Sequence, residues 1–312
     1  MLLKDYFPKV DKKLQNISFS GISFDSSKLK KNNIFFAIKG NTIDGNKFIS
    51  AAIKKGSKII VTENKTKKKI DGALYIRTKN IRKLIAEIAF KIHKIIPKNL
   101  IAVTGTNGKS SIANFYYQIL RLNKKKVASI GTLGVRSDGI NHSLPNTTVD
   151  PLYLGQILKK LKGSKIDNVI MEASSHGLKQ HRLDGLQFST GIFTNLSQDH
   201  IDYHKNFRNY FKAKLYLFEK LIKPKGSVIT DDKIPEFKKI QSVSKKRGLS
   251  IYTLNNHVKN FRILSHRFSG DNQVLKIKYK NLTHNINLNL IGKIQLKNLI
   301  MAIIAANKSN ID

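Results

Sequence analysis

The sequence contains no cysteine, no long apolar run and few acidic residues. A chain of 312 residues without cysteine can build neither a disulfide framework nor a thiolate metal site, and it suits a reducing compartment. No apolar run reaches the roughly 18 residues that a membrane helix needs, and the opening stretch MLLKDYFPKV lacks the apolar core of a signal peptide. We therefore expect a soluble, cytoplasmic protein with no membrane partner.

Acidic residues are outnumbered: 57 Lys and Arg stand against 20 Asp and Glu, a formal net charge of +37. Such an excess is typical of proteins that bind nucleic acid by neutralising its phosphates. Here the basic residues are scattered singly or in short runs, such as KTKKK at 65–69 and NKKKV at 123–127, and no nucleic-acid module occurs among them. We interpret the charge as a solvated, lysine-coated surface and expect no specific nucleic-acid partner.

The length allows two ordinary domains, each with its own core. Short β-like runs alternate with helical ones over the first 95 or so residues. The predicted strands are 21–27, 33–38 and 57–63, and the predicted helices are 47–56 and 80–95. Pro97 interrupts this pattern, because proline cannot continue a helix. We predict an N-terminal domain at 1–97 and a second domain at 98–312.

The second domain has larger repeating units of strand, loop and helix. Its predicted strands are 100–105, 126–131, 167–174, 189–195 and 226–230, and its predicted helices are 109–122, 150–163 and 209–222. After about residue 250 the pattern is more β-like, before a closing helix at 295–307. Alternating strands and helices predict an α/β fold with a doubly wound, mostly parallel sheet covered on both faces, plus a smaller β-rich portion.

One stretch, TGTNGKSS, lies between a predicted strand and a predicted helix. Gly105 and Gly108 let the backbone turn tightly, so that successive N–H groups can face one anion at the start of the helix. Lys109 would reach the terminal phosphates and the Ser110 hydroxyl would sit on Mg²⁺. Val103 stands where the general phosphate-loop pattern has glycine. The strand before, the helix after and the Lys-Ser pair favour a nucleotide phosphate site over a plain structural turn.

Acidic residues and histidines follow two further predicted strands. Glu172 lies near the carboxyl end of one strand, the edge at which open α/β sheets bind ligands, and a carboxylate there can hold Mg²⁺. Asp199, His200, Asp202 and His204 occupy six residues after the next strand. A single strand-end acid or a lone histidine would be as easily structural, but several such groups at one sheet edge indicate a site.

Six motifs occur in a fixed order along the chain: TGTNGKS, NTTVDP, MEASSHGLKQHR, FTNLSQDHIDYH, YFKAKLYLF and IGKIQLKNLIMAIIAA. Together they resemble the Mur ligases of peptidoglycan synthesis, and the resemblance covers nearly the whole chain. SSHGLKQHR and DHIDYH are specific to the branch that adds the third amino acid of the stem peptide. The resemblance implies an ATP-dependent ligase, a monomer, that joins meso-diaminopimelate or L-lysine to UDP-N-acetylmuramoyl-L-alanyl-D-glutamate.

The same resemblance implies roles for individual residues. The implied ATP contacts are Gly105, Thr106, Asn107, Gly108, Lys109, Ser110 and Ser111, with Asn298 at the adenine. The implied Mg²⁺ ligands are Ser110, Glu172, His200 and Lys214, the last as a carbamylated lysine. The implied catalytic groups are Lys109, Lys214, Glu172 and His200. Carbamylation would turn a repelling ammonium into a carboxylate that attracts Mg²⁺.

A second set of residues aligns with the family's substrate contacts. The set comprises Ser26, Asn146, Thr147, Thr148, Ser174, Gln180 and Arg182, and the loop at 39–48 matches the uridine pocket. Three positions depart from the family pattern: Ser27 replaces an arginine, Val149 a proline and Gln295 an asparagine.

The implied reaction starts with transfer of phosphate from ATP to the side-chain carboxylate of D-glutamate, and the incoming amine then attacks the acyl phosphate. The family has three domains, and this chain ends where the third would begin. Two alternatives stay open. One is another ligase of the superfamily, such as folylpolyglutamate synthetase or the D-alanyl-D-alanine-adding ligase, which should lack SSHGLKQHR. The other is a non-catalytic fragment that binds nucleotide and substrate, or a polyanion.

Overall fold

The computed structural model describes residues 1–7, 10–40, 43–65, 69–70, 72–254, 261–269, 272–279, 282–290 and 292–311. Positions 41 and 42 of the expected uridine loop and 66–68 of the KTKKK run lie outside the described residues. The chain divides into two compact units, Met1–Lys94 and Ile95–Asp312.

The first unit is built on a small sheet with strand order β1-β2-β3-β5-β4. Its strands are β1 (Gly21–Ser23), β2 (Asn33–Phe36), β3 (Ile59–Thr62), β4 (Lys69–Ile70) and β5 (Ala73–Arg77). The pairs β1–β2, β2–β3 and β3–β5 are parallel, and β4 pairs antiparallel with β5. Phe35 and Ile60 pack with Ala52 in a buried cluster. The sequence analysis predicted no strand at β4 or β5. Strand β4 has only two residues, and no helix separates β3, β4 and β5 in the sequence to mark them as separate strands.

Helices complete the first unit: α1 (Leu3–Tyr6), η1 (Lys12–Leu14), η2 (Gly45–Phe48), α2 (Ile49–Lys54) and α3 (Ile81–Ile92). The longest, α3, begins where the Asn80 side chain accepts a hydrogen bond from the Lys83 N–H at 2.9 Å, a standard N-terminal cap. Ile81, Ile85 and Ile88 recur at helical spacing and are buried. The apolar periodicity read from the sequence therefore marks the buried face of α3.

The second unit contains an eight-stranded sheet of order β13-β12-β11-β6-β10-β7-β8-β9. The strands are β6 (Asn99–Thr104), β7 (Val127–Gly131), β8 (Gly134–Ser137), β9 (Ile140–His142), β10 (Asn168–Glu172), β11 (Phe188–Phe193), β12 (Ile222–Thr230) and β13 (Ser250–Thr253). All pairs from β13 to β7 are parallel, and β8 and β9 add an antiparallel edge. This topology confirms the predicted doubly wound, mostly parallel sheet.

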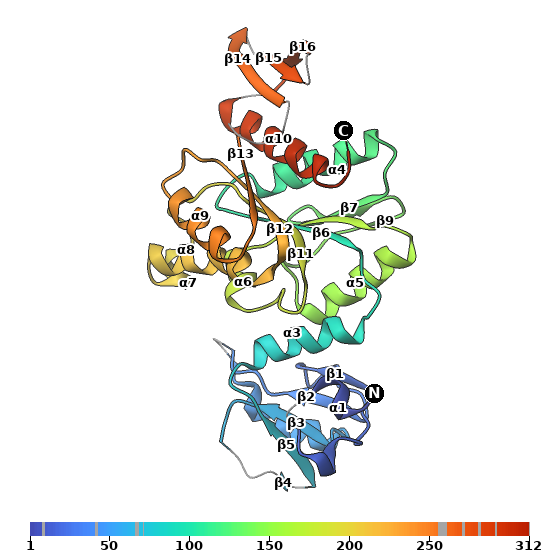
Figure 1. The fold of residues 1–312 in the computed structure, drawn as a ribbon. Helices are drawn as coiled ribbons and strands as arrows, with labels where there is room; N and C mark the ends of the chain where they lie inside the picture. The colour runs from blue at the N-terminus through green and yellow to red at the C-terminus, as the bar shows by residue number, and fades with distance from the viewer. Residues whose placement is uncertain are drawn as a thin grey trace. The chain divides into compact units, whose positions relative to one another are not determined.

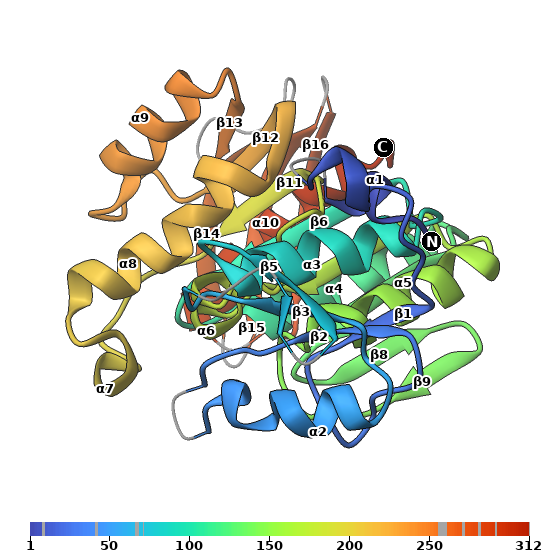
Figure 2. The same cartoon turned by 90° about the horizontal axis from the view of Figure 1, so that it is seen from below.

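Helices cover both faces of this sheet (Figure 1). They are α4 (Lys109–Leu122), α5 (Pro151–Gly163), α6 (Ser175–Lys179), α7 (Ile201–His204), α8 (Phe207–Tyr216), the π-helical turn η3 (Leu217–Leu221), α9 (Phe237–Lys246) and α10 (Gly292–Asn307). On one face α4 and α10 pack together, and α5 lies across the other. Helices α8 and α9 gather beside the β12–β13 edge (Figure 2). The main core joins Ile112 and Tyr116 of α4 and Ile300 of α10 to Ile101 and Val103 of β6.

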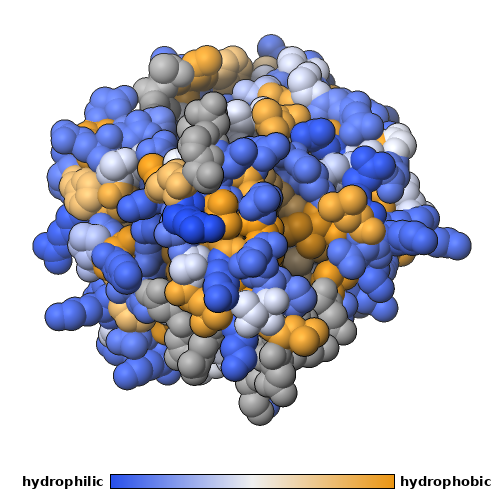
Figure 3. All heavy atoms as spheres, turned by 90° about the horizontal axis from the view of Figure 1, so that it is seen from above, coloured by the Kyte–Doolittle hydropathy of each residue, from blue (hydrophilic) through white to orange (hydrophobic). Residues whose placement is uncertain are grey.

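The smaller β-rich portion is a separate antiparallel sheet of order β14-β15-β16. Its strands are β14 (Phe261–Ser269), β15 (Asn272–Tyr279) and β16 (Leu282–Leu288). Leu275 and Ile277 of β15 belong to the same buried cluster as residues of α4 and α10, whereas Leu264 and Phe268 are exposed. Viewed from above relative to Figure 1, the surface is mostly hydrophilic, with a group of apolar residues near the middle of this face (Figure 3). Among the described helices, none has the length and apolarity to cross a membrane.

Candidate functional site

The loop between β6 and α4 takes a conformation that requires its two glycines. Gly105 and Gly108 have positive φ values of 147° and 85°, a region that other residues rarely adopt. A Cβ on Gly105 would lie 1.8 Å from the Thr194 hydroxyl oxygen, and one on Gly108 would lie 2.5 Å from Asn298 Oδ1. Any side chain at these positions would therefore displace the neighbouring segments that hold the loop.

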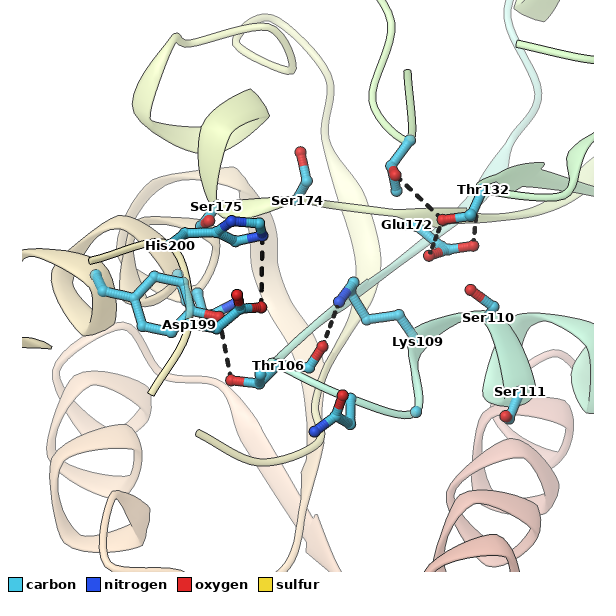
Figure 4. A pocket seen from close by; sticks show the side chains of 15 residues that line it. Thr106, Lys109, Ser110, Ser111, Thr132, Glu172, Ser174, Ser175, Asp199 and His200 are labelled. Carbon is cyan, nitrogen blue, oxygen red and sulfur yellow. Dashed lines mark hydrogen bonds and ion pairs between the residues drawn. The ribbon is translucent and has the colours of Figure 1, made fainter. Parts of the chain in front are cut away.

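This loop borders a cavity of about 310 Å³ that also reaches the carboxyl ends of β7 and β10. The cavity is lined by Thr106, Asn107, Gly108, Lys109, Ser110, Ser111, Thr132, Thr147, Glu172, Ser174, Ser175, Asp199, His200, Tyr210 and Lys214. In Figure 4, Lys109 reaches between Glu172 and Thr132 on one side and Asp199 and His200 on the other. Eleven of these residues belong to the set that the sequence analysis nominated.

Glu172 is a buried carboxylate aimed at the cavity from the end of β10. Only 3% of it is exposed, and it accepts hydrogen bonds from the Thr132 N–H at 2.9 Å and the Thr132 hydroxyl at 3.1 Å. Thr132 stands directly after β7, the next strand of the sheet. These two bonds hold the carboxylate in one orientation and leave its remaining acceptor sites directed at the cavity.

Lys109 and Lys214 converge on the same backbone carbonyl. The Lys109 ammonium donates to Gly105 O at 3.0 Å and Thr106 O at 2.7 Å, and the Lys214 amine donates to Gly105 O at 2.7 Å. Burial lowers the pKa of Lys109, against the opposing charges of Glu172 and Asp199. Burial and the nearby Lys109 charge lower the pKa of Lys214 to about 7. The two lysine nitrogens therefore lie together beside the loop, where they can serve as donors to a phosphate chain.

A cluster of histidine and tyrosine rings adjoins the cavity. The His176 ring lies 4.8 Å from that of His200, 4.0 Å from that of Tyr203 and 5.6 Å from that of His204. His204 is fully buried, and among the described residues neither of its ring nitrogens has a hydrogen-bond partner. Burial lowers its pKa to about 4, helped by nearby positive groups. His204 is therefore a neutral core residue, set back from the cavity that His200 lines.

His200 takes a left-handed backbone conformation, with φ 51°, at the start of α7. Its Nε2 lies 3.5 Å from Asp199 Oδ2, and both side chains are about half exposed. In the described part of the chain, no three histidine, aspartate or glutamate side chains meet as a complete metal site. A cation here would need further oxygen ligands, which Ser110 and phosphate oxygens could supply.

Four of the nominated substrate residues, Thr148, Ser174, Gln180 and Arg182, form a connected hydrogen-bonded group beside Glu172. The Thr148 hydroxyl donates to Glu172 O at 2.9 Å and accepts from the Ser174 N–H at 3.0 Å. Arg182 donates to Thr148 O and, at 2.8 Å, to Gln180 Oε1. Through these bonds the loop before α5 and the loop after β10 hold each other in place.

Other nominated residues lie apart from the main cavity. Asn146 is exposed and does not line it, and Ser26 belongs to the first unit, where its carbonyl accepts a bond from Lys55 at 2.7 Å. Asn298 of α10 is 3% exposed and lines a second cavity of about 240 Å³. Asn107 of the phosphate loop lines both cavities. The loop thus separates a polar chamber from a smaller, more apolar one.

Sequence reasoning left four cavity residues without a role: Thr132, Ser175, Asp199 and Tyr210. Thr132 could have been found, because it follows the carboxyl end of a predicted strand at the ligand-binding edge. Asp199 stood in the polar cluster but was not carried into the site. Tyr210 has no local signal, since a tyrosine on an amphipathic helix is typical of a core position.

Comparison with known proteins identifies the family. The model of the Mur ligase middle domain matches residues 103–306, and that of the Mur ligase family catalytic domain matches residues 18–99. A UDP-N-acetylmuramoyl-L-alanyl-D-glutamate--2,6-diaminopimelate ligase of Rickettsia montanensis is 36% identical over 295 residues, covering 93% of this chain and 61% of the relative. The enzyme of the same name from Zymomonas mobilis is 36% identical over 282 residues, covering 90% of this chain and 58% of the relative.

Solved structures of Mur ligases share the fold of this chain. A structure of a UDP-N-acetylmuramoyl-L-alanyl-D-glutamate--2,6-diaminopimelate ligase superposes with a TM-score of 0.85 at 25% identity, covering all of this chain and 64% of that one. The MurF ligase of Thermotoga maritima in complex with ADP shares the fold, with a TM-score of 0.62 at 16% identity, over 93% of this chain and 63% of that one. The chain spans about 60% of the length of the curated relatives it matches. These matches confirm the resemblance seen in the sequence: the chain belongs to the Mur ligase family.

Proposed function

We propose that this chain provides the ATP-binding and UDP-substrate-binding parts of a ligase of peptidoglycan precursor synthesis. The ligase would add the third amino acid to UDP-N-acetylmuramoyl-L-alanyl-D-glutamate. The observation that carries the proposal is that one cavity is lined by all these groups together. The phosphate loop, Glu172 and Lys214 line it, and so do two of the nominated substrate residues, Thr147 and Ser174. The relatives' names support meso-diaminopimelate over L-lysine as the added residue. We further propose that the protein works as a cytoplasmic monomer.

The two units suggest a division of labour, with Met1–Lys94 holding the UDP end and Ile95–Asp312 holding ATP. Ser26 and the loop at 39–48 are proposed to meet the uridine diphosphate. The phosphate loop from Gly105 to Ser111 is proposed to bind the ATP phosphates, and Asn298 the adenine. The second cavity supports this last role, because it is smaller, mainly apolar and reached directly from Asn107.

Mg²⁺ is proposed to bind at Ser110, Glu172, His200 and Lys214. The residues fit such an ion, since Glu172 is buried with its carboxylate held toward the cavity, and Mg²⁺ is commonly bound by one or two carboxylates plus phosphate oxygens. When bound, it would neutralise charge on the transferring phosphoryl group. Lys214 fits as a carbamate, because an ammonium would repel the cation. A pKa of about 7 leaves a neutral amine that can attack carbon dioxide, forming the N–C bond and releasing a proton, and a ¹³C-carbamate signal under labelled bicarbonate checks this.

The protein's own residues would contribute mainly by positioning and charge. Lys109 lies at the centre of the cavity (Figure 4) and would neutralise the phosphoryl group as it passes from ATP to the substrate carboxylate. Asn146, Thr147, Thr148, Ser174, Gln180 and Arg182 are proposed to hold the muramoyl-dipeptide. The incoming amine would then attack the acyl phosphate, form the amide bond and release inorganic phosphate. This scheme requires no covalent link between substrate and protein.

Calorimetric titration of the 312-residue chain tests the proposal. Wild-type protein should bind Mg·ATP and, separately, UDP-N-acetylmuramoyl-L-alanyl-D-glutamate. Lys109→Ala should weaken Mg·ATP binding at least tenfold, because it deletes a half-buried cation that lines the cavity, while dipeptide binding stays nearly intact. The control is Lys160→Ala, on the exposed side of α5. Unchanged ATP affinity in Lys109→Ala would refute the phosphate-loop assignment.

A phosphate-release assay with added diaminopimelate or lysine then separates ligase from binding fragment. Turnover would establish the ligase activity and its amino-acid preference. Binding of both ligands without turnover would assign recognition to this chain and the chemistry to a longer protein. Binding of ATP without the UDP dipeptide would favour another ligase of the superfamily.

A further inference from the structure

Tyr210 has no role in the function proposed above, yet it lines the cavity proposed to bind ATP. It belongs to α8, is only 1% exposed and lines the same cavity as Lys109. The Lys214 amine lies 4.3 Å from the centre of the Tyr210 ring. A buried tyrosine hydroxyl needs a hydrogen-bond partner, and the identity of that partner suggests what the residue does.

The partner is a hydroxyl of the phosphate loop. The Tyr210 hydroxyl lies 3.1 Å from Thr106 Oγ1. Thr106 Oγ1 also lies 3.2 Å from the Ser197 carbonyl oxygen and 3.0 Å from the Ser197 N–H. A threonine hydroxyl has one hydrogen and two lone pairs. Thr106 therefore donates to the Ser197 carbonyl and accepts from both the Ser197 N–H and the Tyr210 O–H, which uses its full capacity.

These bonds differ in the element to which they connect the loop. The Thr106 N–H donates to Asn195 O at 2.9 Å and the Asn107 N–H to Asn195 Oδ1 at 3.0 Å. Together with the Ser197 bonds, they attach the loop to the segment that follows β11. The Tyr210 bond attaches it instead to α8, the helix that carries Lys214. Among the described residues, the only other hydrogen bond between the loop and α8 runs from the Lys214 amine to Gly105 O.

We infer that Tyr210 is a positioning residue of the ATP site, whose hydroxyl holds Thr106 and so keeps the phosphate loop in register with α8. This inference rests on the proposed nucleotide site. If Lys214 carries the proposed carbamate, its nitrogen keeps one N–H in place of the three of an ammonium. The Tyr210 hydroxyl is unaffected by this change and links loop and helix in either state.

A second buried tyrosine, Tyr116, serves as a control for the loss of a hydroxyl that has only a structural role. Tyr116 of α4 is also fully buried, and its hydroxyl lies 2.9 Å from the Ser309 hydroxyl. It packs in the core between α4 and α10 and does not line the cavity. Tyr116→Phe and Tyr210→Phe each remove one buried, hydrogen-bonded hydroxyl, but only the second removes a contact of the phosphate loop.

The first measurement is hydrogen exchange on the 312-residue chain without nucleotide. Amides from Gly105 to Ser111 should exchange roughly fivefold faster in Tyr210→Phe, the change expected for loss of one hydrogen bond. They should be unchanged in Tyr116→Phe. The second measurement is the Kd for Mg·ATP, which should rise roughly fivefold in Tyr210→Phe and stay at the wild-type value in Tyr116→Phe.

A double-mutant cycle tests the specific pair. Thr106→Val removes the partner hydroxyl, so Tyr210→Phe should weaken ATP binding no further when added to Thr106→Val. Additive effects, or equal effects of the two tyrosine variants, would overturn the inference. Wild-type protein that fails to bind Mg·ATP would refute the nucleotide site, while the exchange rates would still decide whether Tyr210 holds the loop.

Discussion

At the scale of single residues, the site combines charged side chains with deep burial. Glu172 is 3% exposed and Lys214 is 1% exposed, although isolated buried charges are costly. Glu172 is compensated by two hydrogen bonds from Thr132. The cost of burying Lys214 is reduced by its hydrogen bond to Gly105 O. It is reduced further because a pKa of about 7 lets the amine be neutral near neutral pH. These hydrogen bonds hold both buried side chains in fixed positions at the cavity.

His204 yields a prediction about stability and pH. Its folded pKa is about 4, against an ordinary value of 6.5, so between these values the unfolded chain binds more protons. Stability therefore falls as the pH drops from 6.5 toward 4. The positive groups that oppose its protonation are Lys179, His176, Lys214 and His200. Between pH 7 and pH 5 the loss due to His204 should be about 2 kcal/mol.

Urea unfolding at the two pH values checks this prediction. His204→Phe keeps an aromatic ring, loses no hydrogen bond among the described residues and cannot titrate. It should lose about 2 kcal/mol less stability than wild type on acidification. His142→Phe, at an exposed position of β9, should behave like wild type. Equal acid sensitivity of His204→Phe and wild type would show that His204 is not the group responsible.

At the scale of elements, the site depends on where helices begin. Helix α5 starts at Asp150, whose carboxylate accepts bonds from the Leu152 and Tyr153 N–H groups at 3.0 Å each. Pro151 occupies the first helical position, where its missing N–H costs nothing. Thr147 and Thr148 lie just before this cap. The cap therefore fixes both the helix start and the loop that reaches Glu172.

Removing this cap should destabilise the chain. Asp150→Ala leaves two backbone donors at the start of α5 without their acceptor, and the expected loss is about 1 kcal/mol of unfolding free energy. Denaturant titration measures it. The control is Asp138→Ala, because Asp138 is 57% exposed and pairs with Arg121 at 3.4 Å on the surface, an interaction of little energetic value. A loss no larger than that of the control would contradict the role of the cap.

At the scale of the whole molecule, the net charge of +37 predicts a dependence of stability on salt. Like charges repel one another in the compact state, and the screening length falls from roughly 30 Å at 0.01 M to about 8 Å at 0.15 M ionic strength. Raising chloride over this range should stabilise the fold by about 1 kcal/mol, or raise Tm by roughly 2–4 °C.

Thermal unfolding in a chloride series tests this prediction. Sodium, potassium and choline chloride should act alike, because screening depends on ionic strength rather than on the cation. A rise confined to phosphate or sulfate would instead indicate an anion bound at a specific site. A fall in Tm with chloride would mean that favourable ion pairs outweigh the repulsion.

Much of the fold follows from local patterns in the sequence. Helix α4 was predicted at 109–122, the bounds it has, because the phosphate loop marks its start and the apolar face is regular. Strands β6, β7, β10 and β11 are apolar runs, as expected of strands buried on both faces. The sequence analysis did not predict the β8–β9 hairpin. Its strands, Gly134–Ser137 and Ile140–His142, are short edge strands with a weak alternation of apolar residues.

The sequence by itself determined the family, the doubly wound sheet and the glycine-containing loop between β6 and α4, because motifs, strand–helix alternation and turn residues are all patterns of neighbours along the chain. Only the tertiary structure decided that Thr132 holds Glu172 and that Tyr210 holds Thr106, residues 40 and 104 positions apart. Hydrogen bonds of this kind depend on which strand ends and which helix the fold brings to one edge of the sheet. Local propensity carries no information about that arrangement, since the partners meet only once the parallel strands have paired.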